Sequence, residues 1–259
     1  MHPPQGGGLL GAVACTSASA CTAVGWSSAG TLAERWDGTR WTIQATPNPP
    51  QGADVLSGVA CTSASACTAV GATNFTPGAK TLAERWDGTR WSIQPTPNPP
   101  QGGGVLASVA CTSPSACTAA GWSNAGNLAE RWNGTTWSIQ PTPNPAGAQG
   151  TLLDTVACAS ASTCTAAGAY QDSSGAFQGL AERWNGSSWA IQPIPPPGRR
   201  RDEPADRCRL HLGHRLPRRR VLLPEGWQQH PVPGHTGRAV ERLYLAGRTH
   251  PQSAGGGGQ

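Results

Sequence analysis

The chain repeats one sequence unit four times within residues 1–198. Aligned on the tripeptide Val-Ala-Cys, the units begin near Val13, Val59, Val109 and Val156, at spacings of 46, 50 and 47 residues. Each reads V-A-C-(T/A)-S-x-S-x-C-T-A-x-G, a variable stretch, L-A-E-R-W-(D/N)-G-x-x-W-x-I-Q and a Pro-rich close. A period of this length indicates that each unit is one supersecondary structure, which buries its core against its neighbours.

Each unit contains four short segments that are typical of β-strands. In the first unit the first segment ends at V-A-C, and the other three are C-T-A-V-G, T-L-A-E-R-W and T-R-W-T-I-Q. The pair Asp37-Gly38 separates the last two and predicts a two-residue type I′ turn, which would place Trp36 opposite Thr39 and Glu34 opposite Trp41. Alternation along a strand then puts Leu32, Glu34 and Trp36 on one face.

Composition agrees with many short strands joined by turns, because only 13% of residues are charged and the chain holds 34 Gly and 24 Pro. Four strands per unit at this period fit a propeller blade. We therefore predict an all-β, β-propeller-like array of four four-stranded blades of about 48 residues, followed by a disordered tail. The blades fall approximately at residues 5–50, 51–100, 101–147 and 148–198. An open β-solenoid is the alternative architecture.

The pattern A-C-T-A-V-G…L-A-E-R-W-D-G-T-R-W, over residues 5–197, resembles the Trp- and Cys-containing repeats of secreted actinobacterial proteins. It is also similar to other propeller repeats in which a D-G-x-x-W turn recurs in each blade. The resemblance implies a secreted protein built of propeller-type blades, and it carries no specific functional label.

Two cysteines occur in every unit, always with five residues between them. A hairpin with a short loop brings such positions near the Cα separation of about 5.5–6 Å that disulfides prefer. Zinc ligand pairs are usually two to four residues apart, and the repeats contain no His beyond His2. We predict four intra-blade disulfides, each contributing at most about 2–3 kcal/mol, and hence an extracellular or cell-surface protein. The pairs are Cys15/Cys21, Cys61/Cys67, Cys111/Cys117 and Cys158/Cys164.

The paired tryptophans and the Glu-Arg dipeptides recur in every unit, which favours packing between blades over chemistry. A carboxylate pair such as Glu34 with Asp37 would suit glycoside hydrolysis, but catalysis requires one asymmetric set of residues. Residues 1–198 contain no Ser-His-Asp set, phosphate-binding loop or metal motif. We predict no enzyme activity, no catalytic residue, no metal and no cofactor.

The connection between the second and third strands varies most, with 15, 19, 15 and 20 residues from the second Cys to the first Trp of a unit. Variation confined to one connection indicates loops on one face of an array, where ligands commonly bind. These stretches carry aromatic residues that the repeat does not require, and exposed aromatics are plausible ligand platforms. The alternative is that they cap the blade edges. The predicted binding residues are Trp26, Phe75, Trp122, Tyr170 and Phe177.

Both ends of the chain break the pattern. Residues 2–8 match residues 98–104, a junction between units, so we expect Met1 to lie inside a longer repeat array that has lost its signal peptide. Reading GC-rich codons one nucleotide later from Gly198 restores V-A-C-T-S-A-T-A-C and later W-N-G-S-T-W, which indicates a frameshifted tail over 199–259. The alternative is a genuine basic tail.

Charge follows the same division, since residues 1–198 hold seven Lys and Arg against nine Asp and Glu, and the tail holds 12 Arg against five acidic residues. A nucleic-acid partner would depend on the tail alone, so none is predicted. No apolar run reaches the roughly 18 residues of a membrane span.

These observations favour a secreted, non-catalytic propeller module that binds a carbohydrate or protein through its strand 2–3 loops. The alternatives are a structural cell-surface array without a specific ligand, and a fragment of a glycan-active, sialidase-like propeller enzyme. Four units is the low limit for a closed propeller, so open blade edges also predict self-association.

Overall fold

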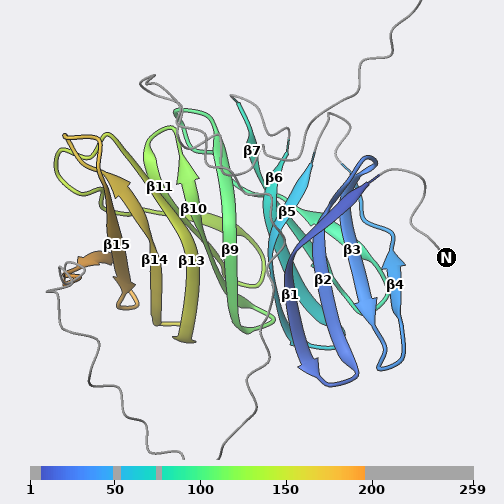
Figure 1. The fold of residues 1–259 in the computed structure, drawn as a ribbon. Coiled ribbons are helices and arrows are strands. Elements are labelled where there is room, and N and C mark those ends of the chain that lie inside the picture. Colours follow the sequence, from blue (N-terminus) through green and yellow to red (C-terminus); the bar gives the residue numbers. More distant parts are fainter. Residues whose placement is uncertain (1–6, 49–53, 74–77, 196–259) are drawn as a thin grey trace, which may run out of the picture. The chain divides into compact units, whose positions relative to one another are not determined.

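A computed structural model describes residues 7–48, 54–73 and 78–195 of the chain. These residues form four antiparallel four-stranded sheets, which we call blades 1 to 4, and Figure 1 shows the sheets side by side in sequence order. The predicted all-β, propeller-like array of four blades is confirmed. Phe75 and the tail from residue 199 lie outside the described residues, so the predicted tail boundary remains a prediction.

The strands follow one another in sequence order within each blade. Blade 1 comprises β1 (Gly8–Ser17), β2 (Ala20–Ser27), β3 (Gly30–Trp36) and β4 (Trp41–Gln44). Blade 2 comprises β5 (Val55–Ser63), β6 (Ala66–Thr73), β7 (Lys80–Trp86) and β8 (Trp91–Gln94). Blade 3 comprises β9 (Gly104–Ser113), β10 (Ala116–Ser123), β11 (Gly126–Trp132) and β12 (Trp137–Gln140). Blade 4 comprises β13 (Gly150–Ser160), β14 (Thr163–Gln171), β15 (Phe177–Trp184) and β16 (Trp189–Gln192).

Neighbouring blades meet through their first strands, because β5 lies between β1 and β9, and β9 lies between β5 and β13. The four-residue fourth strands pair only with the third strand of their own blade. Antiparallel order places the 1–2 and 3–4 connections at one end of each blade and the 2–3 connection at the other. We call the latter the 2–3 end.

Disulfide bonds close the hairpin between the first and second strands of every blade: Cys15–Cys21, Cys61–Cys67, Cys111–Cys117 and Cys158–Cys164. The two cysteines of each pair are direct cross-strand partners, as in Cys15↔Cys21. Their Cα atoms are 3.9 to 4.0 Å apart, closer than the sequence argument assumed. The reason is that directly opposed residues in an antiparallel ladder approach more closely than residues in a general loop.

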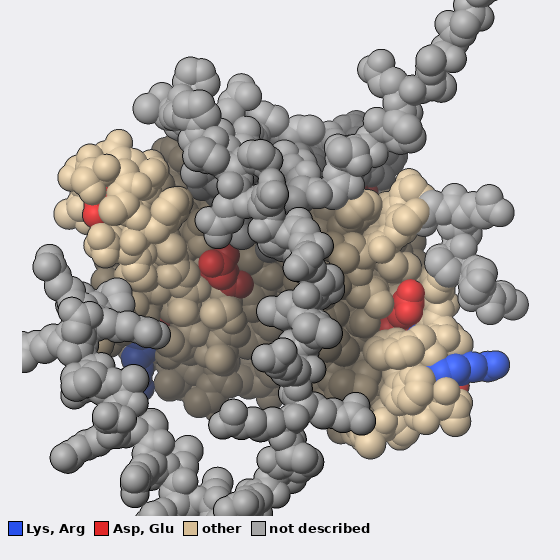
Figure 2. Space-filling model, in the orientation of Figure 1, with Lys and Arg blue, Asp and Glu red and all other residues tan. Residues whose placement is uncertain are grey.

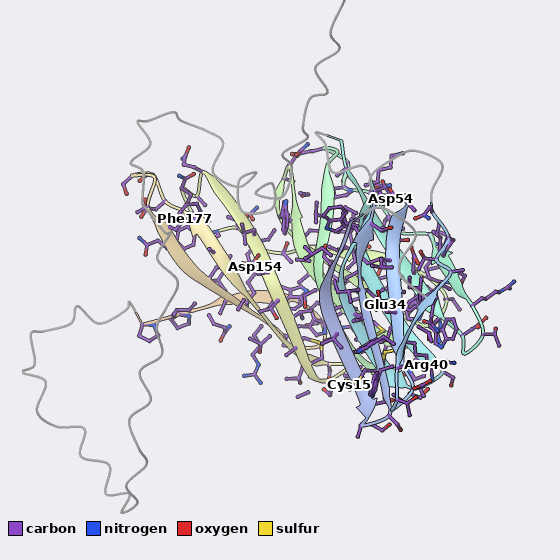
Figure 3. The ribbon with its side chains drawn as sticks, turned by 45° about the vertical axis from the view of Figure 1, so that its right-hand side comes forward. Cys15, Glu34, Arg40, Asp54, Asp154 and Phe177 are labelled. Carbon is purple, nitrogen blue, oxygen red and sulfur yellow. A yellow bond between two sulfur atoms is a disulfide. The ribbon has the colours of Figure 1, made fainter. Side chains whose placement is uncertain are left out.

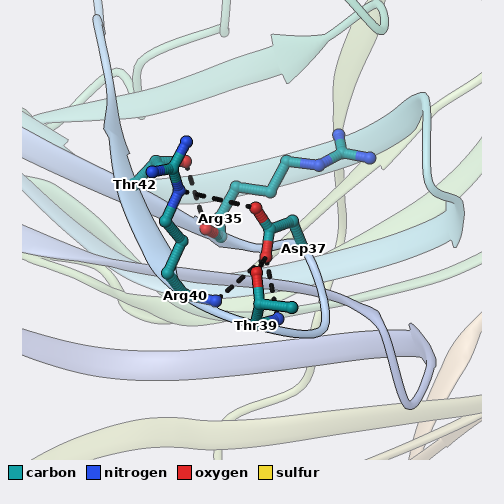
Figure 4. A network of polar contacts seen from close by, with 5 residues as sticks. All are labelled: Arg35, Asp37, Thr39, Arg40 and Thr42. Carbon is teal, nitrogen blue, oxygen red and sulfur yellow. Dashed lines mark hydrogen bonds and ion pairs between the residues drawn. The ribbon is translucent and has the colours of Figure 1, made fainter.

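The predicted two-residue Asp-Gly turn is wrong. Trp36 pairs with Trp41 and Glu34 with Ile43, so four residues, 37–40, form the loop. The Asp37 carboxylate organises this loop by accepting hydrogen bonds from the Thr39 amide at 2.8 Å, the Thr39 hydroxyl at 2.6 Å and the Arg40 amide at 2.9 Å (Figure 4). Because the Asx side chain satisfies these donors, the wider loop replaces the type I′ turn, and Gly38 in it takes a positive φ of 97°.

The glycine of the C-T-A-x-G motif is required by a β-bulge in the first strand. In blade 3 the register shifts beside the pair Gly121↔Leu106, which brings the two backbones close together. A Cβ built on Gly121 would collide with the Val105 carbonyl, and Gly25, Gly71 and Gly168 meet the equivalent carbonyl in the other blades. Only glycine fits this close approach.

Each blade has two different faces. The Trp face carries the large residues, which in blade 2 are Leu56, Cys67, Leu82, Glu84, Trp86 and Trp91. The Ala face carries mostly small residues, which in blade 1 include Thr22, Val24 and Ala33, together with the long side chain of Arg35. Three core clusters each join the Ala face of one blade to the Trp face of the next, as Val24 and Ala33 do with Trp86 and Trp91. The core of this array therefore lies between blades, and Leu32, Glu34 and Trp36 share a face as expected.

Candidate functional site

The 2–3 end holds the connections in which a ligand site was expected. Blades 1 and 3 close them tightly, since Ser27 pairs with Gly30 and Ser123 with Gly126. In both turns the serine side chain accepts a hydrogen bond from the backbone amide two residues later, at 3.2 Å. Only blade 4 has a longer described connection, over residues 172–176.

All four predicted binding residues that the structure describes lie in strands and not in loops, and Phe177 is the first residue of β15. Trp26 is in β2, Trp122 in β10 and Tyr170 in β14, because the hairpin ladders extend to the turns. Trp122 packs against Ala72, Ala79 and Val105 at the junction of blades 2 and 3.

Tyr170 packs against the core cluster between blades 3 and 4, and Trp26 is half-buried. The structure therefore gives Trp122 and Tyr170 the packing contacts expected of edge caps. It does not bring these two residues together with Trp26 in one cluster.

Phe177 is different, because it is 56% exposed at the start of β15. It lies at the 2–3 end, far from the end marked by Cys15 and Arg40 (Figure 3). An aromatic ring in this position offers a flat apolar surface to a ligand.

The loop beside Phe177 is held by Asp172. Its Oδ1 accepts hydrogen bonds from the Ser174 hydroxyl at 2.6 Å and from the amides of Ser174 and Ala176 at 2.9 and 3.0 Å. Its Oδ2 accepts one from the Gln178 side chain at 2.9 Å. These bonds, with the Ser174 hydroxyl first, lower the pKa of Asp172 to about 2. The carboxylate is thus ionised at neutral pH, and it orders the loop next to the exposed ring.

Sequence reasoning missed the asparagines of the Pro-rich segments. Asn48 Oδ1 accepts hydrogen bonds from the Thr31 amide at 2.8 Å and the Thr31 hydroxyl at 3.0 Å. In blade 3, Asn144 Oδ1 accepts one from the Asn127 amide at 3.0 Å. The recurring T-P-N-P motif could have pointed to these asparagines. Each hydrogen-bonds a residue 17 positions earlier in the chain, however, and only the fold brings the two residues together.

Three of the four recurring glutamates are buried between blades, while Glu34 of blade 1 is half-buried. Glu84, Glu130 and Glu182 are fully buried on the Trp faces of blades 2, 3 and 4. The Asn127 side chain of blade 3 donates to Glu182 Oε1 at 2.6 Å. Asp37 sits in an exposed hairpin, where its carboxylate accepts hydrogen bonds from Thr39 and Arg40.

Burial controls the ionisation of these glutamates. Desolvation raises the pKa of Glu84 to about 8, with a smaller lowering by the Thr31 hydroxyl and a further rise from the Asp54 charge. Desolvation likewise raises the pKa of Glu130 to about 8 and that of Glu182 to about 7. Hydrogen bonds from the Thr81 hydroxyl and from Asn127, respectively, lower these values by a smaller amount. Glu84 and Glu130 are therefore mostly protonated at neutral pH, as expected for carboxyl groups inside a core.

The described residues contain no group of three or more His, Cys, Asp or Glu side chains that could hold a metal ion. Within the same ranges, no helix is long and apolar enough to cross a membrane. Charged side chains are sparse on the face drawn in Figure 2.

No protein-family model and no curated protein matches the chain. Solved structures match at low identity, among them the following two. "YCF48 bound to D1 peptide" has a TM-score of 0.39 and 12% identity, covering 71% of this chain and 66% of that one. A fucose lectin from Kordia zhangzhouensis in complex with methyl-fucoside has a TM-score of 0.37 and 10% identity, covering 53% of this chain and 97% of the lectin. With both TM-scores below 0.5, the assignment of the fold rests on the chain's own sheets.

Proposed function

We propose that the chain is a secreted, non-catalytic repeat module that binds a carbohydrate or protein ligand at its 2–3 end. The observation that carries this proposal is the exposed Phe177 ring beside a loop that Asp172 holds in one conformation. An ordered loop loses little conformational entropy when a ligand binds, so a preformed aromatic platform favours recognition. The ring face suits stacking on a sugar or an apolar side chain.

A non-catalytic role is supported by how the repeat uses its carboxylates. Glu84, Glu130 and Glu182 are buried in blade junctions, while Asp37 and Asp87 accept hydrogen bonds within exposed hairpins. The buried glutamates therefore pack between blades, and the aspartates stabilise the hairpin loops. Secretion is supported by the four disulfides, which persist in oxidising compartments. It is also the expectation from the resemblance to secreted actinobacterial repeats.

The test is binding of the full chain to a glycan array and to immobilised extracellular proteins, followed by substitution of the platform. We expect Phe177→Ser to weaken binding of any ligand found by roughly tenfold, as for an aromatic residue at the centre of a contact. The matched control is Ile93→Ser, which removes an apolar side chain that is 41% exposed in blade 2. A ligand that binds the Phe177→Ser variant as tightly as the unmodified chain would show that the platform is not the site.

A further inference from the structure

The first blade exposes a face that is buried in the other three. On the Trp face of blade 1, Val13 is 61% exposed, whereas Val109 and Val156 at the same position of blades 3 and 4 are 7% and 6% exposed. Trp41 is 44% exposed against 4% for Trp91 in blade 2. Apolar surface of this kind commonly marks a site where another protein surface packs.

The last blade exposes the opposite face. Thr165 and Arg183 on the Ala face of blade 4 are exposed, whereas Thr118 at the same position of blade 3 is buried. In the internal junctions these positions have partners. The Thr118 hydroxyl lies 3.6 Å from the Cys164 sulfur, and Arg131 donates to the Ala161 carbonyl at 2.8 Å.

The two exposed faces match the two halves of the blade 3–4 junction in residue type. The Ala face of blade 4 repeats that of blade 3, and the Trp face of blade 1 repeats that of blade 4. Thr165, Ala167, Ala181 and Arg183 correspond to Thr118, Ala120, Ala129 and Arg131. Leu10, Val13, Cys21, Leu32, Glu34, Trp36 and Trp41 correspond to Leu153, Val156, Cys164, Leu180, Glu182, Trp184 and Trp189.

We propose that the Ala face of blade 4 docks on the Trp face of blade 1 of a second copy, in the register of the blade 3–4 junction. Arg183 of one molecule then lies over Trp36 of the other and donates to its Ala18 carbonyl, as Arg131 does with Trp184 and Ala161. The contact joins two different faces, so it adds molecules head to tail and produces open chains or a closed ring. It leaves the 2–3 end free and does not depend on the proposed function.

One position makes this contact weaker than the internal junctions. Blade 4 has Gly179 where blade 3 has Asn127, the residue that donates to Glu182 at 2.6 Å. Across the intermolecular contact, Glu34 would therefore meet a backbone without this donor. A side chain fits at Gly179, because an added Cβ would meet only the Ile194 Cδ1 atom, at 3.6 Å.

Sedimentation velocity of the full chain over a wide range of protein concentration tests the proposal. We expect an average mass that rises with concentration, and monomers for Val13→Asp, which places a charge on the Trp face of blade 1. Ile93→Asp, on blade 2, is the matched control and should associate like the unmodified chain. Gly179→Asn should tighten association about fivefold, the effect of one net hydrogen bond.

A mixing experiment tests the head-to-tail geometry. Ala181→Asp blocks the Ala face of blade 4, so this variant and Val13→Asp should each be monomeric alone. Mixed together they should form a one-to-one complex, because each supplies the intact face that the other lacks. Circular dichroism confirms that both variants are folded.

Three results would overturn the proposal. The first is an unmodified chain that stays monomeric at every concentration, and the second is a mixture of the two variants that remains monomeric. The third is an Ala181→Asp variant that associates as strongly as the unmodified chain, because the Trp face of blade 1 would then dock on some other surface.

Discussion

Arg85 of blade 2 lies over Trp132 of blade 3, with its guanidinium carbon 6.0 Å from the ring centroid. The same guanidinium donates a hydrogen bond to the Pro114 carbonyl at 2.7 Å, in the disulfide-closed hairpin of blade 3. Arg35 and Arg131 make the equivalent pair of contacts across the other two junctions. One repeated residue thus links each blade to the next.

Replacing Arg85 should therefore destabilise the array. We expect Arg85→Ala to lower the free energy of unfolding by about 1–2 kcal/mol, from the loss of one hydrogen bond and one cation–π contact. Arg183→Ala, at the same position of blade 4, is the control. It should change stability by less than about 0.5 kcal/mol, because Arg183 is exposed. Urea denaturation at low protein concentration measures both, and equal losses would contradict a role in the junction.

The glycine beside the bulge should be irreplaceable. We expect Gly121→Ala to cost about 3 kcal/mol or more, since its Cβ would collide with the Val105 carbonyl and the backbone ladder must shift. Gly179→Ala is the control, because a Cβ there makes only ordinary van der Waals contact. It should be neutral or slightly stabilising. Thermal denaturation compares the two, and a Gly121→Ala variant that melts with the parent would disprove the close approach.

The buried glutamates predict that stability falls as pH rises. Their pKa in the folded chain, about 8 for Glu84 and Glu130 and about 7 for Glu182, lies above the ordinary value of 4.5. Between these limits the folded state binds more protons than the unfolded state, so the free energy of unfolding decreases with pH. The slope is about 1.4 kcal/mol per pH unit for each group. The loss is absent below the unfolded pKa and complete above the folded one.

Denaturant titrations from pH 5 to pH 9 measure this slope. Glu84→Gln keeps the shape of the side chain and removes its charge, so the variant should have a shallower slope and gain stability relative to the parent at pH 9. A parent whose stability is flat or rising across this range would contradict protonated glutamates in the junctions. Below about pH 4 the free energy of unfolding should instead decrease as pH falls. The reason is that the pKa of Asp37 and Asp87 in the folded chain is lowered to about 2, chiefly by hydrogen bonds from the Thr39 and Thr89 hydroxyls.

The four disulfides should contribute different amounts to the free energy of unfolding, although all close loops of the same length. By chain entropy alone each should contribute about 2 kcal/mol. The pair Cys61/Cys67 should contribute more than Cys15/Cys21, because Cys67 is buried against Thr22 of blade 1 while the first pair lies on the uncovered Trp face. Double Cys→Ser variants of each pair, compared by denaturation, measure the difference. Equal losses of stability from the two pairs would mean that loop entropy accounts for the whole contribution of each disulfide.

Much of this fold is determined by features that are local in the sequence. The repeat period, the four strands of each blade and the cysteine spacing predict the sheets and the hairpins that the disulfides close. These features concern residues within one unit, so alternation and loop length are enough to place them. The exposed Phe177 was among the predicted site residues for a related reason, since the sequence counts it in the variable stretch between the second and third strands, although the structure makes it the first residue of β15.

Only the tertiary structure decided which surfaces face water. Glu84 and Glu130 are ionisable residues in a strand that sequence alone cannot assign to a core, and the packing of one blade on the next buries them. The same packing covers Trp122 and Tyr170 and leaves Phe177 exposed. The Asp37 loop also escaped prediction, because a side chain that accepts three hydrogen bonds outweighs the preference of Asp-Gly for a tighter turn. In each case the deciding energy comes from contacts between groups that the sequence does not place together: desolvation between blades, and hydrogen bonds formed only once the chain has folded.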